Sequence, residues 1–383
     1  MWRGKVPIPR LYAGLVAASL LGCAGMLAVA IAQPPAKKTL GLAITSWTTS
    51  LYETPDGKEE CPDGLNEGGD QIWLKTLTPE QRDKATRHGT LDAVFLRDQA
   101  MERGPNGEDI CWNPTVIKDP PQKTIQGKKS YGLNLDGTED GHATPKTCAH
   151  EKFVSLDGKT KVDNQWYRVI GCVYGWRKAG GYPEQMPNGE LRDGGHPILV
   201  KITGIDDLRN SKDVTVTFYH STDGMVKDST GAILPNSSYR VEKGYAYTTH
   251  GAIADGVLTT APVDVHFPFY AHFMHSERFF KDARLRLEIA SDGKSAKGVV
   301  AGYYDLDSFW SYFARLGELF TVARFSCPAT YEAAHRLADG YPDPKTGECT
   351  AMSASFDVTA VSGFIIDGDS STAQLTTPGK SAD

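Results

Sequence analysis

Eleven Asp-Gly dipeptides interrupt this chain of 383 residues. An Asp-Gly pair suits tight turns that need positive φ, so it commonly joins short antiparallel strands. The 39 glycines and 22 prolines add further turn positions and disfavour long helices. The sequence therefore predicts a mainly β fold, and the many short strands between tight turns suggest a β-sandwich or jelly-roll-like body.

Several segments carry the residue pattern of β-strands. Residues 284–289 alternate strictly between apolar and polar side chains, and a Ser-Asp-Gly-Lys turn at 291–294 separates them from the run 298–304, which predicts a hairpin. Enrichment in β-branched and aromatic residues predicts further strands at 40–53, 165–176, 197–205, 213–221 and 355–366.

The C-terminal part changes to a helical period. Apolar residues at the spacing of one helix face predict a first helix: Phe309, Phe313, Leu316 and Phe320. A second helix is expected over 328–338, because Pro328 suits the first helical turn.

The pattern divides the chain into four parts: a signal sequence at 1–32, a loop-rich cysteine-containing region at 33–190, a β-sandwich with C-terminal helices at 191–366, and a disordered tail at 367–383. The alternative is that 33–190 and 191–366 form one domain.

The first 32 residues have the pattern of an export signal. Basic residues lie at its start, an uncharged apolar run covers 11–32, and Ala30-Ile31-Ala32 fits the small-x-small rule of a signal peptidase. The run is also long enough for an uncleaved membrane anchor, and Cys23 allows a lipoprotein interpretation. All three interpretations place the rest of the protein outside the cytoplasm, where it would be either periplasmic or secreted. The body is expected to be soluble, with membrane contact only if the N-terminal segment is retained.

The cysteine content agrees with export. After Cys23 the chain has an even set: Cys61, Cys111, Cys148, Cys172, Cys327 and Cys349. Such a set in an exported chain predicts three disulfides. Short loops close most easily, which favours the pairs Cys61–Cys111, Cys148–Cys172 and Cys327–Cys349.

An acidic loop offers one candidate metal site. Asp136, Thr138 and Asp140 match the spacing of the first oxygen ligands of an EF-hand loop, and Asp157 and Asp163 follow nearby. Clustered oxygen ligands favour Ca²⁺, which makes calcium the candidate cofactor. The motif is incomplete because its final glutamate is missing. The alternative is a pair of Asp-Gly turns on the surface.

The stretch 266–277 offers a second candidate metal site. His266, His272 and His275, together with Glu277, are residue types that hold transition metals. His272 and His275 share a face in a helix, whereas they point to opposite sides in a strand. The alternative is an aromatic core with hydrogen-bonded histidines.

A third candidate site combines carboxylates with aromatic residues. Asp305 and Asp307 follow Tyr303 and Tyr304 directly. Apolar faces of sugars stack on aromatic rings and carboxylates accept hydroxyl protons, so this composition suits carbohydrate. Two carboxylates could also act as acid and base in glycoside cleavage. The alternative is a helix cap followed by core aromatics.

No motif in the sequence defines a reaction. The GxSxG elbow, the P-loop and the Rossmann glycine fingerprint are absent from the sequence. A formal charge of −6 and the lack of a basic stripe disfavour nucleic-acid binding. We therefore expect an exported, non-catalytic binding or envelope-structural protein, with carbohydrate or an envelope component as candidate partner and calcium as candidate stabilising ion. The alternative is an extracytoplasmic hydrolase that uses the carboxylate pair or a histidine-held metal.

Overall fold

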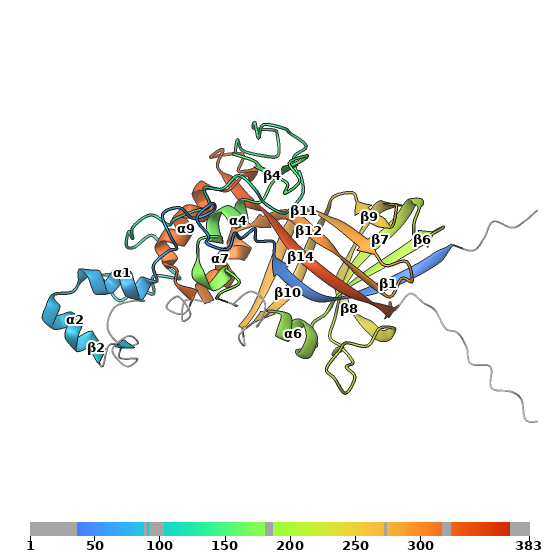
Figure 1. The fold of residues 1–383 in the computed structure, drawn as a ribbon, viewed down its shortest axis with the longest axis horizontal. Helices are drawn as coiled ribbons and strands as arrows, with labels where there is room; N and C mark the ends of the chain where they lie inside the picture. The colour runs from blue at the N-terminus through green and yellow to red at the C-terminus, as the bar shows by residue number, and fades with distance from the viewer. Residues whose placement is uncertain are drawn as a thin grey trace, which may run out of the picture. The chain divides into compact units, whose positions relative to one another are not determined.

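The main sheet of this protein closes on itself. The computed structural model describes residues 37–87, 90–91, 103–180, 187–271, 274–315 and 323–367, which belong to one compact unit. β1 pairs with β6 on one side and with β14 on the other, so Leu42 lies opposite both Val200 and Ser362. The result is an antiparallel β-barrel of eight strands (Figure 1), in the order β1 (Lys38–Thr49), β6 (Ile198–Ile205), β7 (Ser211–Ser221), β8 (Ser237–Ala254), β9 (Val257–Thr260), β11 (Met274–Ile289), β12 (Ser295–Asp305) and β14 (Cys349–Ile366).

The predicted β-sandwich or jelly-roll body is wrong, although the mainly β composition is confirmed. Strands of a barrel and of a sandwich alternate in the same way between a buried and an exposed side, so the residue pattern does not distinguish the two folds. The ladder that closes the barrel joins the first strand, β1, to the last, β14. Thr45 and Thr359 share a hydrogen bond there although 314 positions separate them in the chain. The predicted hairpin is confirmed in the pairing of β11 with β12, where Leu285 lies opposite Val300.

Short strands flank the barrel. β10 (Val263–Ala271) pairs with β11, and β13 (Gly340–Pro342) pairs with the start of β14. Among the described residues, β8 and β10 form no hydrogen-bonded ladder with each other. We call this unpaired boundary between the two strands the seam. Two small ladders complete the strand pairing: β2 (Thr86–Arg87) with β3 (Thr90–Leu91), and β4 (Phe153–Val154) with β5 (Lys161–Val162).

Helices gather at one end of the barrel (Figure 1). α4 (Gln165–Ile170), α7 (Leu306–Arg315) and α9 (Cys327–Arg336) lie there. α9 confirms the second expected C-terminal helix, and α7 confirms the first as far as Arg315, whereas Leu316 and Phe320 lie outside the described residues. The strand predicted at 165–176 is wrong, because the Asn164 side chain accepts a hydrogen bond from Tyr167 N and begins α4. The remaining helices are short: α1 (Gly69–Thr76), α2 (Pro79–Ala85), η1 (Tyr174–Trp176) and α6 (Pro187–Asp193).

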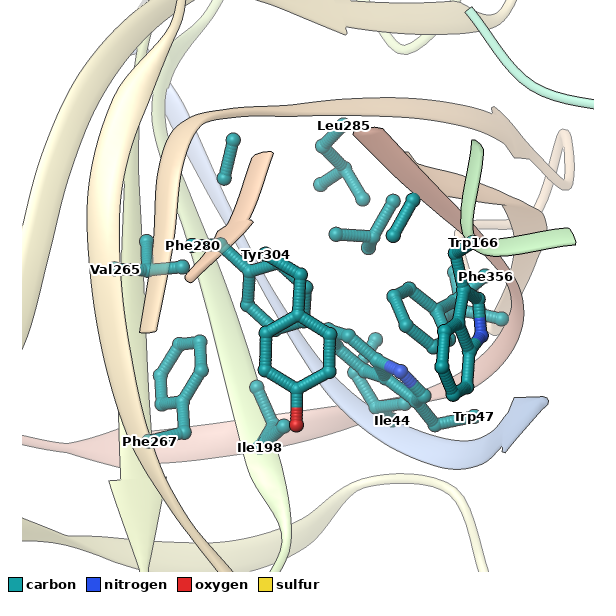
Figure 2. Packing of buried hydrophobic residues seen from close by; sticks show 14 of the residues in the cluster. Ile44, Trp47, Trp166, Ile198, Val265, Phe267, Phe280, Leu285, Tyr304 and Phe356 are labelled. Atoms are coloured by element: carbon teal, nitrogen blue, oxygen red, sulfur yellow. The ribbon is translucent and has the colours of Figure 1, made fainter. Parts of the chain in front are cut away.

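Large aromatic side chains fill the barrel (Figure 2). The Trp47 ring centroid lies 5.5 Å from that of Phe356 and 6.3 Å from that of Phe280, and Phe280 stacks on Tyr304 at 4.8 Å. Trp166 of α4 extends this cluster toward the helices. The interior is therefore a packed core, and binding sites have to be sought in the wall and the connecting segments.

Three disulfides are present, as the six cysteines predicted, but the predicted pairings are wrong. The bonds join Cys61 to Cys172, Cys111 to Cys327 and Cys148 to Cys349, in place of Cys61–Cys111, Cys148–Cys172 and Cys327–Cys349. The short-loop argument describes an unfolded chain. In the folded protein, segment 103–180 packs against the helices and β14, so its cysteines meet partners that are distant in sequence.

The disulfides suggest an extracytoplasmic location, since such bonds persist in oxidising compartments. The predicted signal sequence at 1–32 and the predicted tail after Asp367 lie outside the described residues. Within the part of the chain that the structure describes, no helix is both long and apolar enough to cross a membrane.

Candidate functional site

A buried ionic cluster connects the loop-rich region to the C-terminal part of the chain. The carboxylates of Asp136, Asp163 and Asp339 gather around the Lys152 ammonium and the His150 ring, and none of these side chains is more than 5% exposed. Lys152 Nζ lies 2.5 Å from Asp136 and 2.8 Å from Asp163, and His150 Nε2 lies 2.9 Å from Asp163. Two cationic groups thus oppose three carboxylates.

Backbone groups hold the carboxylates of this cluster in place. Leu135 N donates a hydrogen bond to Asp163 at 2.7 Å, and Ser353 N of β14 donates one to Asp339 at 2.6 Å. Burial opposes protonation of His150, but the hydrogen bond to Asp163 and the charge of Asp339 raise the pKa of His150 to about 9. Burial raises the pKa of Asp339 to about 6, against the opposing charge of His150. His150 is therefore charged at neutral pH, and the cluster can brace the loops against β14.

The structure brings only part of the predicted calcium site together. Asp136 and Asp163 meet in the ionic cluster, and Thr138 donates hydrogen bonds to Asp136 from its backbone N and its hydroxyl. Asp140 and Asp157 lie on the surface, where Asp140 contacts His142 and Asp157 pairs with Lys159.

A metal ion would compete with a lysine in this cluster. Asp136, His150 and Asp163 could hold an ion, because one ligand atom from each lies within 4.8 Å of the others. Lys152 already binds both carboxylates, so an ion would have to displace its ammonium. The structure does not test the calcium binding expected from the sequence, but the position of Lys152 argues against it.

A cavity of about 360 Å³ opens at the seam between β8 and β10. Its volume lies in the range of small-molecule sites. Two residues of the lining, Val265 and Phe280, also belong to the barrel core (Figure 2), so packing holds the strands that carry the cavity. The lining comes from β8, β10, β11 and the end of β12: Tyr247, Asp264, Val265, His266, Phe279, Phe280, Lys281 and Asp305.

His266 and Phe279 form an aromatic side of this cavity. The two residues lie opposite each other in the β10–β11 ladder, and their rings stack with centroids 3.9 Å apart. Glu277 Oε2 lies 2.9 Å from Nε2 of the histidine ring. Phe279 is 40% exposed. A half-exposed aromatic ring supported by a second ring can stack against a flat apolar face of a ligand.

Charged groups flank the aromatic rings. Asp305 accepts a hydrogen bond from Ser308 N at 2.9 Å with one oxygen and so caps α7. Asp264 accepts one from Asp282 N at 2.9 Å, also with one oxygen. Lys281 completes the polar part of the lining. The cavity therefore offers both acceptors and a cationic donor beside its apolar side.

The other predicted site residues lie apart from this cavity. His275 lies at the beginning of β11, where its ring meets Tyr270 at a centroid distance of 4.5 Å, and His272 lies outside the described residues. Asp307 is exposed in the first turn of α7 and does not line the cavity. Of the predicted histidines and carboxylates, the cavity thus contains His266 and Asp305.

The sequence reasoning missed several residues of both sites. Phe279 and Lys281 are two positions apart in β11 and share one side of the strand. Strand periodicity could have identified them if β11 had been predicted to begin before 284. No comparable signal marks Lys152 or Asp339, because the ionic cluster forms from loops that are distant in sequence.

Comparisons with protein families, with curated proteins and with solved structures find no match to this chain. A proposal of function therefore depends on the geometry of these sites.

Proposed function

We propose that this protein is an exported, non-catalytic binding protein and that its ligand is a carbohydrate. The supporting observation is the half-exposed ring of Phe279 in a cavity that also contains two carboxylates and a lysine. A sugar has an apolar C–H face that stacks on aromatic rings, and hydroxyl groups that hydrogen-bond to charged side chains. Asp264 and Asp305 each use one oxygen within the protein, so the second oxygen can accept a bond from a hydroxyl.

Export is part of this proposal. The pattern of the first 32 residues and the three disulfides both support it. N-terminal sequencing of the protein from its natural source would show whether the signal is cleaved. Cell fractionation would separate a periplasmic from a secreted location.

Titration calorimetry of the disulfide-intact protein against a panel of soluble oligosaccharides tests the site. Phe279→Ala is expected to weaken binding of the best ligand about tenfold, because it removes the stacking surface. Phe364→Ala is the matched control, since Phe364 of β14 is 62% exposed and does not line the cavity. The proposal fails if no oligosaccharide binds, or if both variants bind like the unmodified protein.

The same experiment separates binding from hydrolysis. Product analysis after incubation would show an intact oligosaccharide if the protein only binds. Cleavage that is lost in Asp305→Asn would instead make the cavity an active site, with the carboxylate of Asp305 taking part in the reaction.

A further inference from the structure

One arginine of β11 lies among aromatic rings at the end of the barrel where β11 begins and β12 finishes. The guanidinium carbon of Arg278 is 3.3 Å from the ring centroid of Phe269 in β10 and 5.3 Å from that of Tyr312 in α7. It is 5.8 Å from the ring centroids of Tyr304 in β12 and Phe356 in β14. Tyr304 and Phe356 belong to the barrel core, so the Arg278 side chain points inward.

This cation has no anionic partner in the part of the chain that the structure describes. Its neighbour Glu277 points to the other side of β11, where it contacts His266. Arg278 Nε is buried without a hydrogen-bond partner. Aromatic faces stabilise a guanidinium in part, but charges inside proteins are ordinarily paired as well. A bound anion would supply the missing partner.

Two further donors of this aromatic cluster are also unpartnered. The Tyr304 hydroxyl and the Trp47 indole Nε1 are buried and form no hydrogen bond. Their side chains are 1% and 6% exposed, and both rings contact that of Phe280. An indole N–H only donates, and a tyrosine hydroxyl can donate. Three donor groups thus surround one aromatic cluster in which none of them has an acceptor, which favours a ligand that brings acceptor oxygens.

We propose that Arg278 binds the carboxylate of a small aromatic or aliphatic acid, with the Tyr304 hydroxyl as a second donor. A guanidinium matches a carboxylate through two parallel hydrogen bonds, and the surrounding rings offer apolar surface for the rest of the molecule. The Arg278 side chain is partly exposed, so an acid can reach it from solvent. Arg278 does not line the carbohydrate cavity, and the site can be tested without a sugar.

Calorimetric titration of the disulfide-intact protein with benzoate and with decanoate tests this proposal, and benzamide is the uncharged comparison. We expect one acid to bind per chain, and benzamide to bind at least about tenfold more weakly than benzoate. Arg278→Gln should weaken binding of the acid by at least about tenfold, and Tyr304→Phe should weaken it less. Arg286→Gln is the matched control, because Arg286 is an exposed arginine of the same strand.

Thermal melting gives a second measurement. A bound acid should raise the melting temperature of the unmodified protein and of Arg286→Gln, but not that of Arg278→Gln. Three results would overturn the proposal: neither acid binds, Arg278→Gln binds like the unmodified protein, or benzamide binds as well as benzoate. Circular dichroism checks that each variant is folded. If Arg278→Gln does not fold, Arg278→Lys and Tyr304→Phe decide the question, and unchanged affinity in both would contradict the site.

Discussion

Replacing Lys152 by methionine tests how strongly the buried ionic cluster stabilises the loop-rich region. The lysine side chain is 2% exposed, and its ammonium lies within 2.9 Å of Asn134, Asp136 and Asp163. Methionine retains much of the apolar stem but removes the charge. His150 is then the remaining cationic group beside the carboxylates of the cluster. Loss of one partner of a buried ion pair costs about 3–5 kcal/mol, a large part of the about 5–15 kcal/mol that stabilises a typical domain.

Urea unfolding followed by tryptophan fluorescence, with the disulfides intact, measures this loss. Adding Asp136→Asn to Lys152→Met should recover part of the stability, because it removes a carboxylate that has lost its partner. Lys159→Met is the matched control, since Lys159 pairs with Asp157 where both side chains are mostly exposed, and it should leave the unfolding midpoint unchanged. A loss below about 1 kcal/mol in Lys152→Met, as for an exposed ion pair, would refute the reasoning.

Two further predictions concern the same cluster. The pKa of His150 is raised from 6.5 to about 9 in the folded protein, so its contribution to stability is complete below pH 6.5 and is lost as pH rises through about 9. Urea midpoints measured across this window should fall by the equivalent of about 3 kcal/mol, whereas His150→Gln should flatten the profile; an equal slope in that variant would contradict the assignment. Calcium added to metal-free protein should leave the melting temperature unchanged, because Lys152 already neutralises Asp136 and Asp163. A saturable rise in melting temperature would show instead that the ion binds.

The positions of tight turns were predicted correctly from the Asp-Gly pairs. Asp255-Gly256 joins β8 to β9 and Asp292-Gly293 lies between β11 and β12, and the two glycines have positive φ values of 82° and 70°. Closure of the barrel could not be predicted in this way, because it depends on the ladder between β1 and β14. The disulfide pairing failed for the same reason, since it follows from contacts between distant segments.

The candidate sites were predictable only in part. Asp136 and Asp163 were both assigned to the predicted calcium site, and they do meet in the structure although 27 positions separate them in the chain. Lys152 falls between them in the chain, yet a lysine in a loop is ordinarily a solvated surface residue, so its buried position had no sequence signal.

The cavity lies toward one end of the barrel, where the helices gather and β12 finishes. β12 finishes at Asp305, which lines the cavity. At the opposite end, tight turns at 255–256 and 292–293 join the strands. The first end instead connects to long segments and to the helices (Figure 1), which supply charged and aromatic groups. A packed barrel that positions such groups at one end can support a binding site, because its rigid wall fixes the residues at the ends of several strands.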